Sequence, residues 1–130
     1  MINSYTKDEI IGWLIKKFET TPQIQTREIS SAYNIPDKFV RMFLKQLHNL
    51  QMLNYSEMGM GYVLLHPAME LYDFHSKGGF TVQDELLKKN IEKLYLEIEN
   101  LKPHFSEKAE LFANLSTIGA TIFSALKFLH

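Results

Sequence analysis

The sequence contains no cysteine, and it has only six glycines and four prolines among 130 residues. The absence of cysteine excludes disulfide bonds and thiol chemistry, and it is typical of a protein kept in a reducing cytosol. No repeat or low-complexity tract is present. Because 45% of the residues are apolar, the chain can bury a real core, and we expect one small domain with an appendage.

An excess of positive charge is also missing. Fourteen Lys and Arg stand against fifteen Asp and Glu, which gives a net charge of −1. Residues 1–75 carry seven basic and eight acidic side chains, again −1. Phosphate contacts supply most of the affinity of nucleic-acid-binding proteins. Any nucleic-acid site in this chain must therefore come from local clustering of basic residues.

The sequence has no motif that predicts catalysis, a metal site or a cofactor. It has no P-loop, no G-x-S-x-G and no H-E-x-x-H. Its histidines are scattered, without the paired spacing of metal ligands: His48, His66, His75, His104 and His130. We therefore predict a protein that is not an enzyme and that has no metal or cofactor.

Residues 26–65 have the order of two helices followed by a hairpin. Thr26 suits the N-cap of a short helix, and Asn34 suits the left-handed residue that ends it. Pro36 fits the first turn of the next helix, where a missing N–H costs nothing. This order predicts a helix-turn-helix whose second helix covers residues 36–52.

The predicted helix 36–52 has one apolar and one basic face. The apolar face follows helical spacing through Val40, Phe43, Leu47 and Leu50. The opposite face carries Lys38, Arg41, Lys45 and His48. A solvated charged face is the ordinary interpretation of such a pattern. The alternative is DNA contact, because this is the face that a helix-turn-helix presents to the major groove.

A hairpin is expected directly after this helix. Residues 53–57 and 62–65 are short runs rich in aromatic and aliphatic side chains. Met58, Gly59, Met60 and Gly61 link them and supply the positive φ angles of a tight connection. Short helix, turn, longer helix and hairpin together are the order of a winged helix.

Two segments carry a family resemblance: I-S-S-A-Y-N-I-P-D-K-F-V-R-M-F-L-K-Q-L at 29–47 and M-G-M-G-Y-V-L at 58–64. They resemble the winged-helix core of Rrf2-type bacterial transcription regulators, in which an I-P-x-K-[FYL] helix start and a G-G-Y-x-L wing recur. The resemblance covers about residues 6–66. The chain departs from the pattern in having no cysteine for an iron–sulfur cluster and no Arg or Lys in the wing.

A winged helix of this kind implies a set of DNA-contacting residues. Helix 36–52 would lie in the major groove, with Arg27 on the DNA backbone and two tyrosines near the wing. The predicted DNA-binding residues are Arg27, Lys38, Arg41, Lys45, His48, Tyr55 and Tyr62.

The winged-helix part is expected to begin with a helix and to end before a glycine pair. Residues 6–9, Thr-Lys-Asp-Glu, have the pattern of a capping box at the start of the first helix. Residues 68–75 can form two further helical turns, and Gly78 with Gly79 breaks them. We place the domain boundary here, with a winged helix-turn-helix domain at 1–76 and a helical region at 77–130.

The region 77–130 carries heptad spacing that favours dimerisation. The predicted dimerisation residues are Leu87, Ile91, Leu94, Ile98 and Leu101 in a helix that starts at Thr81, and Leu115, Ile118 and Ile122 in the last helix. A short coiled coil is marginal alone, so we expect the helices to pair between two chains. The alternative is a helical hairpin within one chain.

The last helix has a second interpretation. Leu111 to Leu129 is apolar over nearly the length that crosses a bilayer, with Asn114 and Lys127 as its strongly polar residues. Small residues around Gly119 suit close packing in a bundle as well as in lipid.

Taken together, the sequence predicts a mainly α protein with a small β-hairpin, in which a winged helix-turn-helix precedes C-terminal dimerisation helices. The predicted function is that of a cytoplasmic, homodimeric bacterial transcription regulator that binds double-stranded DNA. The alternative is a winged-helix protein-interaction module, tethered to the cytoplasmic face of the inner membrane by helix 110–129.

Overall fold

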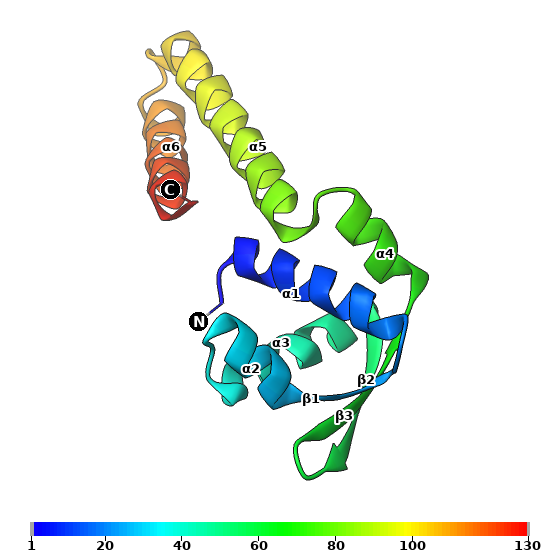
Figure 1. The fold of residues 1–130 in the computed structure, drawn as a ribbon. Coiled ribbons are helices and arrows are strands. Elements are labelled where there is room, and N and C mark those ends of the chain that lie inside the picture. The colour runs from blue at the N-terminus through cyan, green and yellow to red at the C-terminus, as the bar shows by residue number, and fades with distance from the viewer. Residues whose placement is uncertain (1, 130) are drawn as a thin grey trace. The chain divides into compact units, whose positions relative to one another are not determined.

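A computed structural model of the chain describes residues 2–129 as a mainly helical protein with one small antiparallel sheet, which confirms the predicted balance of α and β structure (Figure 1). The helices are α1 (Ser4–Phe18), α2 (Thr26–Tyr33), α3 (Asp37–Asn49), α4 (Met69–Ser76), α5 (Gly79–Leu101), the 3-10 helix η1 (Lys102–Phe105) and α6 (Ala109–Leu129). The strands are β1 (Gln23–Gln25), β2 (Leu53–Gly59) and β3 (Tyr62–Pro67). The chain divides into two compact units, an N-terminal unit at 1–82 and a C-terminal unit at 83–130.

The sheet of the N-terminal unit has the strand order β1-β3-β2. Strands β2 and β3 form the expected hairpin, and its connection has φ angles of 85°, 57° and 79° at Gly59, Met60 and Gly61. Strand β1 was not predicted. It pairs antiparallel with β3 and places Ile24 opposite Val63. Three residues are too few to show the alternation that identifies a strand.

The core of the N-terminal unit lies between the helices and the sheet. Its buried residues are Ile10, Ile11, Leu14, Ile24, Ile29, Val40, Phe43, Leu44, Leu47, Leu53, Val63, Leu65, Leu71 and Phe80. Helix α4 contributes Leu71, and the ring of Phe80 at the start of α5 meets that of Phe74 edge to face, with centroids 4.8 Å apart. These contacts hold α4 and the first turn of α5 on the N-terminal unit.

The predicted starts of α1, α2 and α5 are wrong, and α5 begins at Gly79 rather than at Thr81. Helix α1 begins at Ser4, where the Asn3 side chain accepts a hydrogen bond of 2.8 Å from the Thr6 N–H. Thr26 is the first residue of α2 rather than its cap, and only 1% of it is exposed. Asn3 and Thr6 can both cap a helix, so the local sequence does not decide between them, and Gln25 takes the cap position of α2 in place of the buried Thr26. Asn34, in contrast, is left-handed at φ 52° as predicted.

Asp8 caps a helix other than its own. Its carboxylate accepts hydrogen bonds from the N–H of Phe80 at 2.7 Å and from the N–H of Thr81 at 2.9 Å, and also from the Thr81 hydroxyl at 2.6 Å. Gly79 permits this approach, because a Cβ there would lie 2.2 Å from Asp8 Oδ1. The start of α5 is therefore fixed to α1.

The C-terminal unit is a helical hairpin in which α5 and α6 lie side by side and run in opposite directions (Figure 1). The rings of Tyr95 and Phe123 lie 5.7 Å apart. Gly119 allows close approach, since a Cβ there would lie 3.6 Å from Ile98 Cγ2 and 3.3 Å from Glu99 Oε1. Helix α5 therefore packs against α6 of the same chain, the arrangement that the sequence left as the alternative.

This packing divides the predicted dimerisation residues into two groups. Ile98 is buried, and Ile91, Leu115 and Ile122 are half-buried in the hairpin. Leu87, Leu94, Leu101 and Ile118 are exposed, by 44–50%. Half of the predicted residues are thus used within the chain.

Candidate nucleic-acid interface

Helix α3 exposes one row of side chains that no other described residue covers. Lys38, Met42, Lys45 and Asn49 follow one another at intervals of four, three and four, so they lie along one side of the helix. All four are exposed, Met42 by 57%. We call these four residues the outer row. The sequence analysis found its two lysines and missed Met42 and Asn49, although the same helical spacing connects all four.

Arg41 lies beside the outer row but is held by two carboxylates. Its Nε donates to Asp37 Oδ2 at 2.7 Å, one turn earlier on α3, and its Nη1 donates to Glu57 Oε1 on β2, also at 2.7 Å. Both bonds are charge-assisted, and the bond to Glu57 joins the helix to the hairpin. Arg41 is therefore a residue that fixes the hairpin against α3.

Two other predicted DNA-binding residues belong to this same junction. The Tyr55 hydroxyl donates to Glu57 Oε1 at 2.7 Å. The Tyr55 N–H donates to Nδ1 of His48 at 3.2 Å, so the histidine is tied to β2 through that nitrogen. The structure thus brings Arg41, His48 and Tyr55 together where α3 meets β2, and each of them bonds to a residue of the other element.

The junction shifts the ionisation of its groups. The hydrogen bond from Tyr55, followed by that from Arg41, lowers the pKa of Glu57. The Thr26 hydroxyl, followed by Arg41, lowers the pKa of Asp37 against the opposing effect of burial. Burial and the Glu57 carboxylate raise the pKa of Tyr55 to about 12. Near neutral pH the junction therefore has one cation, two anions and a neutral tyrosine.

The two lysines of the outer row lie against aromatic rings. Lys45 Nζ is 6.0 Å from the centre of the Tyr55 ring, and Lys38 Nζ is 5.5 Å from that of Phe39. Aromatic faces attract ammonium groups without neutralising their charge. Neither amino group is in a salt bridge within the part of the chain that the structure describes.

The remaining predicted DNA-binding residues lie outside this group. Arg27 is exposed in the first turn of α2, and its Nε donates to the Gln25 side chain at 2.8 Å. Tyr62 opens β3 and is 36% exposed. Beside it, the hairpin tip presents Met58 and Met60, 52% and 97% exposed, and no basic side chain.

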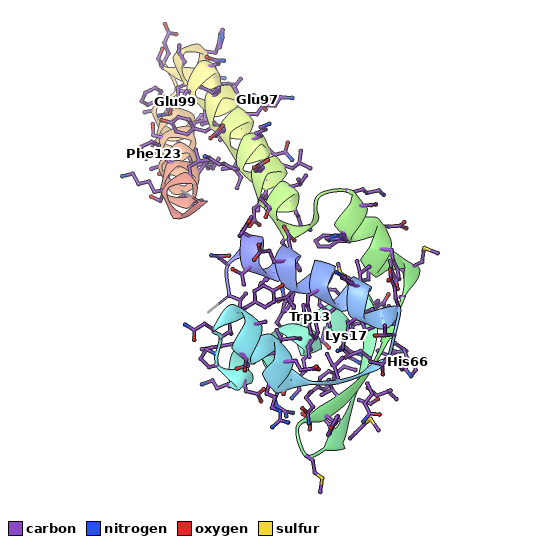
Figure 2. The ribbon with its side chains drawn as sticks, viewed as in Figure 1. Trp13, Lys17, His66, Glu97, Glu99 and Phe123 are labelled. Carbon is purple, nitrogen blue, oxygen red and sulfur yellow. The ribbon has the colours of Figure 1, made fainter. Side chains whose placement is uncertain are left out.

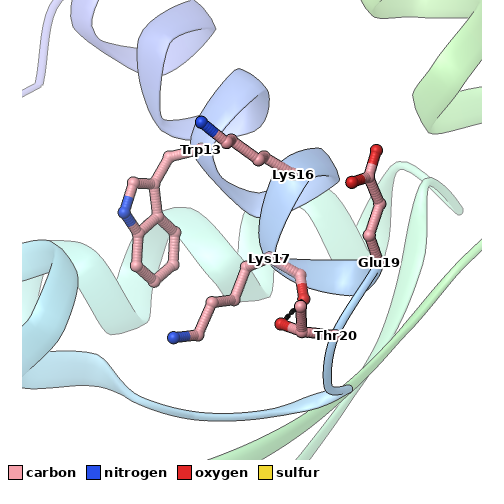
Figure 3. A pocket seen from close by; sticks show the side chains of 5 residues that line it. All are labelled: Trp13, Lys16, Lys17, Glu19 and Thr20. Carbon is pink, nitrogen blue, oxygen red and sulfur yellow. Dashed lines mark hydrogen bonds between the residues drawn. The ribbon is translucent and has the colours of Figure 1, made fainter.

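Two hollows open on the N-terminal unit away from the predicted residues. One, of about 400 Å³, is lined by Trp13, Lys16, Lys17, Glu19 and Thr20 at the end of α1 (Figure 3). The charge of Lys17 is compensated there by Glu28, whose Oε1 lies 3.4 Å from Nζ. The other, of about 490 Å³, is apolar and is lined by Ile2, Lys7, Phe39, Met42, Phe43 and Gln46. Neither hollow contains a group of side chains that selects a ligand.

Within residues 2–129, no three His, Asp or Glu side chains are grouped as a metal site would need. Comparisons of the chain with protein-family models, with curated proteins and with solved structures found no match. A function can therefore be argued only from the residues of this chain.

Proposed function

We propose that the chain is a winged-helix protein that binds double-stranded DNA as a homodimer and regulates transcription, with α3 in the major groove. The element order α1-β1-α2-α3-β2-β3 and the strand order β1-β3-β2 support a winged helix. The resemblance of residues 6–66 to Rrf2-type regulators favours the same assignment.

The observation that carries the proposal is the outer row of α3. Lysine suits phosphate or the O6 and N7 of guanine, asparagine suits the N6 and N7 of adenine, and an apolar side chain suits the methyl of thymine. Lys38, Met42, Lys45 and Asn49 thus combine the side-chain types that read a major groove. They are exposed on a helix that Arg41 holds rigidly against the hairpin.

The charge of the chain limits the expected affinity. The net charge is −1, and Arg41 is neutralised by its two carboxylates, so few cations remain for phosphate. A single copy with two or three phosphate contacts binds weakly at physiological salt. A homodimer engages two half-sites and gains affinity because the second contact is intramolecular.

The test is fluorescence anisotropy of labelled mixed-sequence duplex DNA titrated with the full chain over a series of salt concentrations. The proposal predicts binding at low salt and a linear fall of log K with log salt, with a slope of several units from the lysines of two copies. Absence of binding at the lowest salt, by protein shown to be folded, contradicts it.

One observation favours a second function, a winged-helix interaction module tethered to a membrane. Residues Ala109–Lys127 of α6 are long and apolar enough to cross a bilayer, with a mean hydropathy of 1.3, and only 6% of this stretch is buried in the described structure. Such a protein sediments with membranes until detergent is added, whereas the proposed regulator stays in the supernatant.

A further inference from the structure

The C-terminal unit leaves most of its apolar side chains uncovered. Within residues 83–127, Ile98 and Leu126 are the buried large apolar side chains, whereas the N-terminal unit buries fourteen. Two helices with so small a core are not expected to hold together in water, because most helix stability comes from tertiary burial. The hairpin therefore needs a further surface to pack against.

Three exposed leucines of α5, Leu87, Leu94 and Leu101, lie on one side of the hairpin. A helix turns by roughly 100° per residue, so Leu94 and Leu101 lie to one side of Ile98 and Tyr95 lies to the other. Leu87 precedes Leu94 by seven residues and shares its side. The ring of Tyr95 contacts the ring of Phe123. These two rings therefore lie on the side of the hairpin opposite Leu94.

Two exposed apolar residues of α6, Leu111 and Ile118, lie on the same side as these leucines. Around Gly119, which faces Ile98, the ring of Phe123 lies to one side and Ile118 to the other. Leu111 precedes Ile118 by seven residues. Because the helices are antiparallel and Phe123 adjoins Tyr95, the two leucine-bearing sides coincide. One continuous apolar face results, composed of Leu87, Leu94, Leu101, Leu111 and Ile118, each 43–50% exposed.

The charges beside this apolar face decide what covers it. Glu97 lies beside the apolar face, because it follows Leu94 by three residues and precedes Leu101 by four. Lys93 lies one turn before Glu97 on α5. Figure 2 shows Glu97 directed away from α6, whereas Glu99 lies toward it. A hydrocarbon layer would have to bury these charges at a cost of several kcal/mol. A protein surface that carries both acidic and basic side chains avoids that cost, because Lys93 and Glu97 can form ion pairs with it.

A surface with leucines at heptad spacing and paired Lys and Glu at its edge is complementary to itself. We infer that the apolar face packs against the same face of a second copy, so that two hairpins form a four-helix bundle. The inference rests on the proposed homodimer and names its interface. It keeps part of the prediction from the sequence: Leu87, Leu94, Leu101 and Ile118 remain interface residues. The other predicted residues, Ile91, Ile98, Leu115 and Ile122, hold each hairpin together.

The test compares two leucines of α5 by size-exclusion chromatography with light scattering on the full chain. Wild-type protein is predicted to have twice the 15.2 kDa mass of one chain. Leu94→Glu puts a carboxylate in the proposed interface and is predicted to give monomers. Leu96→Glu makes the same change at a residue that is 61% exposed on the outer side of α5, and it is predicted to remain dimeric.

Each outcome has a distinct meaning. A dimeric Leu94→Glu protein overturns the proposed interface and leaves the homodimer standing, whereas a monomeric wild-type protein overturns the homodimer itself. DNA contact by α3 is measured separately, because loss of the dimer is expected to weaken DNA binding without removing the contacts that α3 itself makes.

A second measurement covers the case in which Leu94→Glu fails to fold. Because the chain has no cysteine, Leu94→Cys and Leu96→Cys each introduce one thiol. A short bismaleimide is predicted to cross-link two copies through Leu94→Cys and much more slowly through Leu96→Cys. Equal rates contradict the proposed interface.

Discussion

Arg41 Nη1 lies 2.7 Å from Glu57 Oε1, in an ion pair that joins helix α3 to the hairpin. Arg41 also pairs with Asp37 on its own helix. Arg41, which the sequence predicts to contact DNA, thus also has a structural role, so substitution of Arg41 alone does not test DNA binding.

Reversal of the Arg41 charge is predicted to destabilise the fold. Arg41→Glu would place a third carboxylate beside Asp37 and Glu57, with no cation between them. We expect a thermal midpoint several degrees below that of wild type, measured by circular dichroism. Lys38→Glu, at an exposed lysine in the first turn of α3 that forms no salt bridge in the described structure, should change the midpoint little. Equal midpoints for the two variants would show that the junction contributes nothing to stability.

Loss of the Asp8 carboxylate is predicted to release the start of α5. Asp8→Ala leaves the Phe80 and Thr81 N–H groups without their acceptor. Loss of such a cap costs about 0.5–2 kcal/mol of the free energy of unfolding, measured by urea denaturation. Glu9→Ala is the control, because the Glu9 side chain is exposed on the same helix. A cost for Glu9→Ala as large as that for Asp8→Ala would contradict this role.

Acid is predicted to weaken the junction. The pKa values of Glu57 and Asp37 lie below their ordinary values of 4.5 and 3.8, chiefly through the Tyr55 and Thr26 hydroxyls respectively and then through Arg41. At pH values between the lowered pKa of a group in the folded chain and its ordinary pKa, the unfolded chain binds more protons than the folded chain. The stability that these groups contribute is therefore present above about pH 5 and is lost as the pH falls through their folded pKa values.

Urea denaturation over a pH series measures this loss. Glu57→Gln removes one of the two carboxyls, so its stability should fall less steeply with acid than that of wild type. Glu70→Gln, which alters an exposed carboxyl on α4, should keep the wild-type slope. If Glu57→Gln and wild type show the same slope, the carboxylate of Glu57 is not linked to folding.

The sequence predicted the parts of the fold that have a strong local signal. The left-handed residue Asn34, the hairpin with its Gly59 and Gly61 connection, and the helical spacing of α3 follow from backbone conformation and periodicity alone. Strand β1 gave no such signal, because a strand of three residues is defined by its partner β3.

The candidate site was harder to predict than the fold. Helical spacing identified the polar side of α3 but not the partners of its charges. Glu57 lies sixteen residues from Arg41 in the sequence, and only the fold of the hairpin brings them together. In the C-terminal unit, heptad spacing identified the apolar residues but could not assign them to contacts within one chain or between two.

The central claim is that the outer row of α3 contacts DNA, and charge reversal within that row tests it most directly. One double variant carries Lys38→Glu and Lys45→Glu. The control double variant carries Lys16→Glu and Lys77→Glu, which change the net charge by the same amount at two exposed lysines, one in α1 and one directly after α4. Each is titrated against labelled duplex DNA by fluorescence anisotropy at low salt, after circular dichroism has shown that it is folded. We predict that the α3 variant loses at least about tenfold in affinity, with a shallower salt dependence, and that the control stays near wild type. Equal affinities for the two double variants would contradict the claim that α3 is the DNA-binding element.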